Sequence, residues 1–245
     1  MKEKNELHIK KEESWKMFNS IASTYNCLNS VLSVGILRSW RLKLVNSVPK
    51  GDNLNILDCA TGTGEVMFSI MKKRSLDIQK ITGIDLAQKM MDEGINLKKG
   101  FSYANKIHFR CESATEIPFD AHSFDCVSMA FGIRNVDNHV KCLEEISRVL
   151  KPGGVALIME FSLPKNRVIK QLYLLYFRYI LPFIGGLVSG DYNAYKYLNK
   201  TVETFPYGSQ FKQLMETVEL DTKFKTLTLG IATLYIGTKR AHVTL

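Results

Sequence analysis

Residues 54–65 read LNILDCATGTGE, an apolar run that ends in two glycines one residue apart. The run has the length and composition of a buried strand, and a helical pattern follows it. Glycines at the end of a strand let the backbone turn tightly and approach a ligand closely. The stretch therefore predicts a strand-turn-helix unit that binds a nucleotide-type cofactor.

The spacing of these glycines narrows the class of cofactor. A dinucleotide fingerprint would place a third glycine at position 67, which is Met67 here, and the Gly-Lys-Ser/Thr ending of a phosphate-binding loop is absent. Asp85 ends the next expected strand, about 20 residues later, where a carboxylate can accept hydrogen bonds from ribose hydroxyls. This combination resembles the S-adenosylmethionine site of Rossmann-like methyltransferases. The alternative is a tight turn followed by an exposed aspartate.

Short apolar runs alternate with helical patterns along the chain, which is the rhythm of a mostly parallel sheet. The expected strands are 54–59, 80–85, 107–111, 124–130 and 154–160, with a closing hairpin at 223–229 and 232–238. The clearest helix is 139–150, because its apolar residues Val140, Leu143, Ile146 and Leu150 share one face. The sequence Lys-Pro-Gly-Gly that follows ends it, because proline cannot continue a helix. We predict an α/β, Rossmann-like fold whose mostly parallel seven-stranded sheet has an antiparallel final strand and a helical cap.

Length and composition fit one domain of this kind. The chain has 245 residues, of which 45% are hydrophobic and 23% charged, and these values exclude a wholly disordered protein. We expect a single domain over 1–245. Its parts are N-terminal helices (1–50), a cofactor-binding core (51–164), a helical cap over the substrate site (165–220) and a C-terminal hairpin (221–245).

The cysteines and the first residues bear on the compartment. Five cysteines, an odd number without Cys-x-x-Cys spacing, argue against a disulfide framework and a zinc site. No cluster of histidine, cysteine and carboxylate residues has ligand spacing, so we predict no metal site. Residues 1–15 alternate lysine and glutamate without the apolar run of a signal peptide. We therefore expect a cytoplasmic protein.

Five segments carry a specific family resemblance. Residues 131–136 read FGIRNV directly after the fourth expected strand, and residues 148–154 read RVLKPGG. Residues 17–41, 176–182 and 203–206 also match, and together the resemblance covers roughly residues 15 to 240. The chain is similar to the quinone-biosynthesis C-methyltransferases, which act on demethylmenaquinol or on 2-methoxy-6-polyprenyl-1,4-benzoquinol.

This resemblance implies a class I S-adenosyl-L-methionine-dependent methyltransferase that methylates a ring carbon of a prenylated quinol. Demethylmenaquinol is the expected substrate, and the benzoquinol precursor of ubiquinone, or both rings, is the alternative. The residues expected to bind the cofactor are Asp58, Gly62, Thr63, Gly64, Asp85, Ser113 and Ala114. The chain departs from the family at Ser113, at Ala130 and at Glu65, where asparagine, serine or glycine, and aspartate are common.

Methyl transfer to an aromatic carbon requires a ring hydroxyl to lose its proton, so the protein must stabilise an oxyanion. Arg134 is the best candidate, because a guanidinium stays protonated and aims several donors at one oxygen. Tyr25 and Asn135 lie in segments expected to reach the pocket, and Asn135 can only orient the substrate. An ion pair that closes the loop after the fourth strand is the alternative role for Arg134.

The predicted cap suggests how the protein contacts a prenylated substrate. Residues 172–188 are mostly apolar, but the stretch is shorter than the roughly 20 residues of a transmembrane helix and contains Arg178 and Pro182. It predicts a helix-break-helix that lines a prenyl channel or enters the membrane interface, with plain packing on the sheet as the alternative. The net charge of +9 favours peripheral contact with an anionic membrane, at the inner face.

Two other functions compete with this interpretation. The net charge also suits an RNA or protein methyltransferase, although no Asn-Pro-Pro-Tyr motif follows the fourth strand and no basic nucleic-acid-binding domain is visible. We therefore expect no nucleic-acid partner. A non-catalytic scaffold of quinone biosynthesis is the second rival, and cofactor titration separates it from an enzyme. The oligomeric state stays open, with a homodimer as one option.

Overall fold

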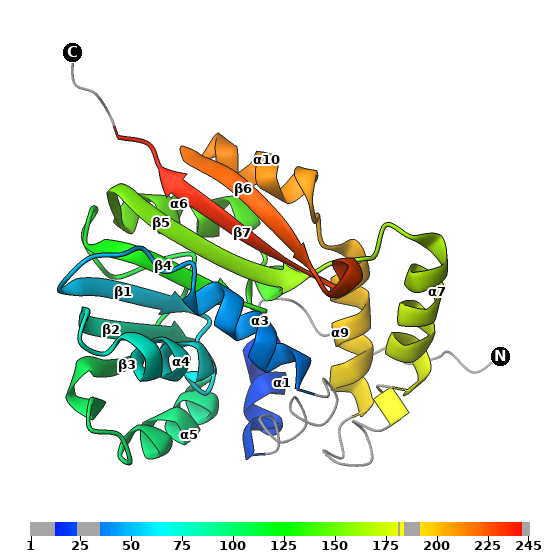
Figure 1. The fold of residues 1–245 in the computed structure, drawn as a ribbon. Helices are drawn as coiled ribbons and strands as arrows, with labels where there is room; N and C mark the ends of the chain where they lie inside the picture. Colours follow the sequence, from blue (N-terminus) through cyan, green and yellow to red (C-terminus); the bar gives the residue numbers. More distant parts are fainter. Residues whose placement is uncertain (1–12, 24–34, 181, 184–191, 242–245) are drawn as a thin grey trace.

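A seven-stranded sheet in the order β3-β2-β1-β4-β5-β7-β6 crosses the molecule in the computed structural model (Figure 1). The structure describes residues 13–23, 35–180, 182–183 and 192–241. The strands are β1 (Leu54–Cys59), β2 (Ile78–Asp85), β3 (Ile107–Cys111), β4 (Phe124–Ala130), β5 (Leu150–Phe161), β6 (Leu220–Leu227) and β7 (Ala232–Lys239). All pairs from β3 to β5 are parallel, and β7 is antiparallel to both β5 and β6. The predicted fold class is confirmed.

The boundaries of three predicted strands are those of β1, β3 and β4, whereas β5 begins four residues before its predicted start. Phe124 pairs with Leu150 but Cys126 pairs with Val155, so residues 151–154 interrupt the regular register. The Pro-Gly-Gly turn thus forms an irregularity within the strand, because the backbone on both sides of it still pairs with β4.

Helices cover both faces of the sheet. On one face, α3 (Ile36–Val45) and α4 (Glu65–Arg74) contribute Leu44, Met67 and Ile70 to one hydrophobic core. On the other face, α6 (His139–Val149) and α10 (Ser209–Thr217) bury Leu143 and Phe211 in a second core. The remaining elements beside the sheet are α5 (Gln88–Lys98), η2 (Ala104–Lys106), η3 (Ile133–Asn135) and η5 (Thr228–Gly230).

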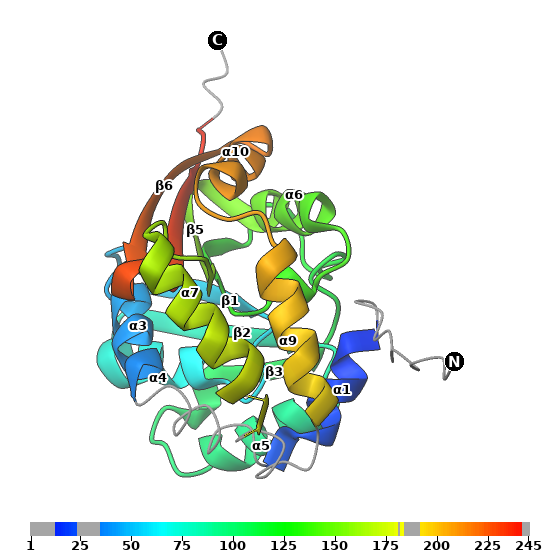
Figure 2. The same ribbon diagram turned by 90° about the vertical axis from the view of Figure 1, so that its right-hand side faces the viewer.

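Three further helices lie beyond the carboxyl ends of the parallel strands. They are α1 (Ser14–Ser20), α7 (Arg167–Leu175), which continues into the π-helical turn η4 (Tyr176–Ile180), and α9 (Tyr192–Thr204). Figure 2 shows α7 and α9 side by side over this edge of the sheet, with α1 next to α9. None of the helices in the described ranges has both the length and the apolar character needed to cross a bilayer. The site described next lies at the same edge of the sheet, and of these three helices only α1 contributes to its described lining.

Candidate functional site

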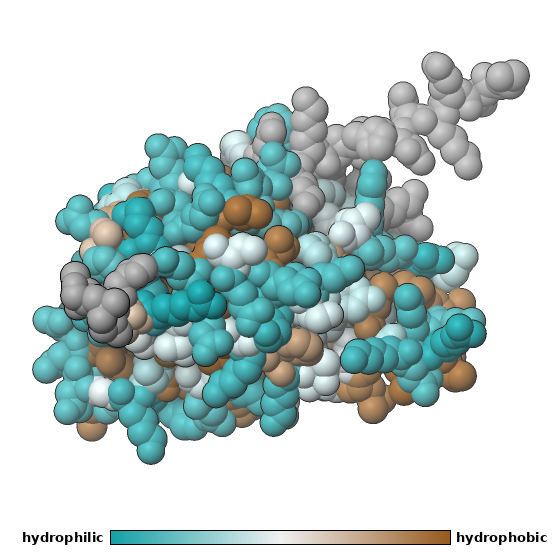
Figure 3. Space-filling view, turned by 90° about the horizontal axis from the view of Figure 1, so that it is seen from above, coloured by the Kyte–Doolittle hydropathy of each residue, from teal (hydrophilic) through white to brown (hydrophobic). Residues whose placement is uncertain are grey.

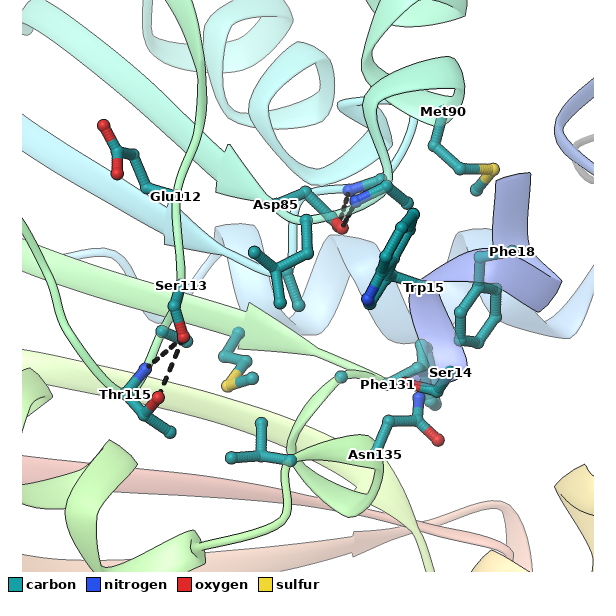
Figure 4. Close-up of a pocket in the computed structure, with 18 of the residues that line it drawn as sticks. Ser14, Trp15, Phe18, Asp85, Met90, Glu112, Ser113, Thr115, Phe131 and Asn135 are labelled. Atoms are coloured by element: carbon teal, nitrogen blue, oxygen red, sulfur yellow. Dashed lines mark hydrogen bonds between the residues drawn. The ribbon is translucent and has the colours of Figure 1, made fainter. Parts of the chain in front are cut away.

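A cavity of about 320 Å³ opens at the carboxyl ends of the strands, where the strand order reverses between β1 and β4. Its walls come from the loops after β1, β2, β3 and β4 and from α1 (Figure 4). Such a reversal point is where open α/β sheets bind their ligands, because the loops on its two sides diverge and leave a crevice.

The carboxylate of Asp85 at the end of β2 is held by two backbone donors. The N–H of Gly62 donates to Oδ2 and the N–H of Ala87 donates to Oδ1, both at 2.8 Å. Burial raises the pKa of Asp85 above its ordinary value, and these hydrogen bonds oppose the rise. Each oxygen can accept further hydrogen bonds, so the carboxylate can receive two vicinal hydroxyls in the cavity that it lines.

The two glycines of the turn after β1 serve different purposes. Gly62 lines the cavity at φ +53°, and a Cβ there would lie 3.4 Å from Met90 Cε. Gly64 has φ +79° and immediately precedes α4, and a Cβ there would lie 2.8 Å from the ring of Phe109. Gly62 thus borders the ligand space, whereas Gly64 permits close packing of the turn on β3.

Besides Gly64, two of the predicted cofactor ligands, Asp58 and Thr63, are not among the described residues that line the cavity. Asp58 is buried in β1, where its Oδ1 accepts from Ser128 Oγ and its Oδ2 from Thr61 Oγ1, both at 2.6 Å. Burial raises the pKa of Asp58 to about 6, against the lowering effect of these two hydroxyls. The carboxyl therefore fastens the turn to β1 and β4. Thr63 is also buried and, like Asp58 and Gly64, is not among the described residues that line the cavity.

The opposite walls are formed by the loop after β3 and by α1. Ser113 and Ala114 line the cavity, and Ser113 Oγ lies 2.8 Å from Thr115 Oγ1. Trp15 and Phe18 reach in from α1 on the side away from Ser113 (Figure 4). Asn19 Oδ1 accepts a hydrogen bond from Lys89 N–H at the start of α5 and so fixes α1 there. The sequence predicts N-terminal helices over residues 1–50 but no role of Trp15 or Phe18 in the site.

The charged side chains among the described residues that line the cavity are carboxylates, and one of them, Glu112, is paired with Arg110 at 3.1 Å. The described lining includes the carboxyl residues Asp85, Glu112 and Asp137, and no lysine or arginine. Negative charge in a concave site favours a cationic ligand and disfavours phosphate groups. The site thus matches a nucleoside that carries positive charge rather than a nucleotide.

Two of the three predicted catalytic residues, Arg134 and Asn135, are described by the structure and follow each other in η3. Arg134 is buried in η3, where Nη1 donates to Glu160 Oε1 at 2.8 Å and to the carbonyl of Phe131 at 2.5 Å. Burial raises the pKa of Glu160, and the charge of Arg134 opposes that rise. Asn135 lines the cavity, and Tyr25 lies outside the described residues.

Two polar atoms near this loop lack a partner. Within the described part of the chain, Arg134 Nε and Asn135 Oδ1 are buried and make no hydrogen bond. Buried polar atoms are rarely left unpaired, and since Asn135 lines the cavity, its Oδ1 is a candidate contact for a bound molecule. Arg134 is not among the described residues that line the cavity. The ion pair of Arg134 does not use its whole guanidinium.

Comparison with known proteins supplies independent findings. The model of the ubiE/COQ5 methyltransferase family matches residues 6–239. A ubiquinone/menaquinone biosynthesis C-methyltransferase UbiE from Geotalea daltonii is 45% identical over 95% of this chain and 99% of its own length. A demethylmenaquinone methyltransferase from Bacteroides fragilis is 38% identical over 94% of both chains. A SAM-dependent methyltransferase structure from Thermotoga maritima shares the fold, with TM-score 0.63 and 17% identity over 92% of this chain and 99% of that one.

Proposed function

Since the chain belongs to the ubiE/COQ5 methyltransferase family, we propose that it transfers the methyl group of S-adenosyl-L-methionine to a ring carbon of a prenylated quinol. The observation that carries this proposal is the cavity in which two backbone N–H groups hold Asp85 among carboxylates and without a cation. The family and the cavity point to the same chemistry from independent data.

The residues of the cavity fit this cofactor. We propose that Asp85 accepts the two ribose hydroxyls and that Ser113 and Ala114 flank the adenine. The positive sulfonium and ammonium groups match the acidic lining, with Glu112 and Asp137 beside the ligand space. Asp58, Thr63 and Gly64 then act on the cofactor through the shape of the turn that contains Gly62.

Demethylmenaquinol is the substrate that we propose first. The relatives from Bacteroides fragilis and from Thermus thermophilus, 38% and 36% identical, are demethylmenaquinone methyltransferases. The relative from Geotalea daltonii bears the names of both quinone pathways, which keeps the methoxy-polyprenylbenzoquinol as the alternative. Both rings have a hydroxyl beside the carbon that receives the methyl group, so the same site can serve either.

The cofactor supplies an activated methyl group, and the protein must position the ring and stabilise the oxygen that loses its proton. We propose that Arg134 provides that stabilisation through the part of its guanidinium left over by Glu160, and that Asn135 orients the ring from the cavity wall. Support comes from their two unpaired buried atoms, Arg134 Nε and Asn135 Oδ1, within the described residues. The catalytic role of Tyr25 stays a prediction, because this residue lies outside the described ranges.

A prenylated quinol resides in a lipid bilayer, so we propose a cytoplasmic protein that contacts the inner face of an anionic membrane. The net charge of +9 supports this contact. A homodimer remains a prediction, which light scattering of the purified protein tests.

Two measurements test the function. Calorimetry should detect S-adenosyl-L-methionine binding, and mass spectrometry should detect one added methyl group on a short-chain demethylmenaquinol. As a matched control, Glu93→Gln on the exposed face of α5 should behave as the wild type. Cofactor binding without methylation of either quinol would contradict the proposed quinol substrate. Absence of cofactor binding would contradict an enzyme and favour the non-catalytic scaffold.

The choice between the two quinones is made in cells. A strain lacking this protein should accumulate demethylated menaquinone precursors, as measured by mass spectrometry of extracted quinones. Accumulation of the benzoquinol precursor alone would select the alternative substrate.

A further inference from the structure

The outward face of α7 and η4 is apolar. Val168, Leu172, Leu175 and Tyr179 follow one another at intervals of three or four residues, which places them on one side of the helix, and Phe183 follows four residues later, beyond η4. Their exposed fractions are 65%, 63%, 54%, 68% and 65%. Hydrophobic side chains gather at the right-hand side of Figure 3, where α7 lies. We call these five residues the apolar stripe.

The apolar stripe is not part of the hydrophobic core. The opposite face of the same helix is anchored by Tyr173 and Phe177, which are 8% and 4% exposed and whose rings contact each other at a tilt of 37°, with 4.8 Å between ring centroids. Phe177 also contacts the ring of Phe161 at the end of β5. The helix is therefore fixed by one apolar face while a second apolar face is directed at solvent. A helix with apolar residues on both sides needs a second apolar environment.

Basic residues accompany the apolar stripe. Arg167 and Arg178 lie beside it on the helix, Lys165 just precedes α7 and Lys170 lies toward the anchored face, and residues 161–190 contain no aspartate or glutamate. Arg178 is paired with Glu203, whereas Lys165, Arg167 and Lys170 form no ion pair with any described residue. Arg167 is the first residue of α7, where the helix dipole disfavours a positive charge. These charges therefore have a role other than stabilising the helix.

We propose that the apolar stripe docks on the surface of an anionic lipid bilayer, with α7 and η4 lying in the plane of the interface. An apolar face bordered by lysine and arginine is the composition of interfacial helices, whose side chains enter the headgroup region while their charges meet anionic lipid. The inference rests on the proposed function, which requires a substrate with a prenyl tail. The apolar stripe is then the surface that brings the protein to the membrane in which the prenyl tail lies. It belongs to a helix beyond the carboxyl ends of the parallel strands (Figure 1).

Vesicle binding tests the docking surface without any quinol or cofactor. Sedimentation with vesicles of equimolar phosphatidylglycerol and phosphatidylcholine should bring down the wild type, and Leu172→Gln/Leu175→Gln should weaken partitioning about tenfold for each leucine. Leu76→Gln is the matched control, since Leu76 is 93% exposed in the turn between α4 and β2. Failure of the wild type to bind, or an equal effect of the control, would overturn the proposal.

The charges are tested separately. Lys165→Gln/Arg167→Gln/Lys170→Gln should weaken binding about fivefold for each charge removed, and added salt should weaken the wild type in the same direction. The control Lys72→Gln/Lys223→Gln/Lys225→Gln removes as many exposed charges from α4 and β6. Equal binding by both triple variants would show a non-specific attraction and overturn the docking surface.

Activity and oligomeric state complete the test. The leucine variant should retain turnover of a water-soluble short-chain quinol and lose turnover of a long-chain quinol presented in vesicles. Loss of both would contradict a role limited to the membrane. If light scattering shows that the leucine variant breaks a dimer while its vesicle binding is unchanged, a second copy of the chain covers the apolar stripe and the proposal is wrong. Absence of methylation with intact vesicle binding would instead refute the proposed function alone.

Discussion

Arg134 Nη1 lies 2.8 Å from Oε1 of Glu160, and both side chains are almost completely buried. The backbone N–H of Arg134 also donates to Oε2 of Glu160, so one carboxylate holds both the main chain and the side chain of η3. The pair therefore fixes the loop after β4 against β5. It also leaves Nε of the guanidinium without a partner within the described residues. The structure thus shows Arg134 in the role of holding the loop, and its catalytic role remains a proposal.

Arg134→Lys should keep the positive charge but lose the planar set of donors, so turnover should fall while cofactor affinity stays near that of the wild type. Arg134→Ala should lower kcat by two to three decades, as the loss of an oxyanion donor worth about 3 to 4 kcal/mol does. Stopped assays with a short-chain demethylmenaquinol measure the rate, and calorimetry measures cofactor affinity. Arg74→Lys, at another arginine paired with a carboxylate, is the control, and its kcat should not change. Near wild-type turnover of Arg134→Ala would show that this residue holds the loop after β4 and has no part in catalysis.

Glu160→Gln should destabilise the fold by about 3 to 5 kcal/mol, because it leaves the charge of Arg134 buried without its partner. Urea unfolding measures the change in free energy. Arg134→Met/Glu160→Gln removes both charges and should recover much of that loss without recovering activity. A double variant as unstable as Glu160→Gln would show that the uncompensated charge is not the cause.

Asp85→Ala should weaken S-adenosyl-L-methionine binding about ten- to a hundredfold, since a charged hydrogen-bond acceptor contributes roughly 1.5 to 3 kcal/mol. The fold should survive, because the N–H groups of Gly62 and Ala87 can bond to water in the open cavity. Calorimetry gives the affinity and a thermal melt gives the stability. Asp92→Ala, on the exposed face of α5, should leave both unchanged. Unaltered affinity of Asp85→Ala would remove this residue from the cofactor site.

Gly62→Val and Gly64→Ala should separate ligand binding from folding. A β-branched residue at φ +53° is strained and its side chain would border the ligand space, so Gly62→Val should abolish cofactor binding in calorimetry. Gly64→Ala should mainly lower the melting temperature, because its methyl group meets Phe109 and the left-handed backbone costs about 1 to 2 kcal/mol. Equal stability and equal affinity in the two variants would contradict the division of roles.

Asp58 should make the folded state less stable as the pH rises. Its pKa is about 6 in the folded protein against an ordinary 3.8, so the folded state binds the proton more tightly, and that stability is lost as the pH rises through 6. The full effect is about 3 kcal/mol at most. Asp58→Asn should therefore lose less unfolding free energy than the wild type between pH 4 and pH 8, as measured with urea. Identical pH dependence of the two proteins would refute the raised pKa.

The sheet could be predicted because its strands are apolar runs bounded by glycine, proline and polar residues. β1, β3 and β4 begin and end where the pattern changes, and Asp85 and Gly62 were found because the end of one parallel strand lies beside the end of the next. Those relationships depend on residues close in sequence or on a regular strand order, and both can be read from the amino-acid sequence.

The direction of individual side chains could not be predicted in this way. Asp58 points to Ser128, which is 70 residues away, rather than into the cavity, and that choice is made by hydrogen bonds across two strands. Trp15 and Phe18 line the cavity because α1 is held on α5 by Asn19, a tertiary contact with no pattern in the sequence. The signal that could have found them is an aromatic pair on a short helix preceding the sheet.

The position of β7 has a consequence for synthesis on the ribosome. This strand is synthesised after the other six strands of the sheet, yet it lies inside the sheet between β5 and β6. Until it emerges, β5 presents an unpaired edge, and β6 has no neighbour to join. Trp40 in α3 likewise waits for Thr228, to which its Nε1 donates at 2.8 Å across 188 residues. A chain in which β7 has not yet formed thus exposes an apolar strand edge of the kind that recruits other chains.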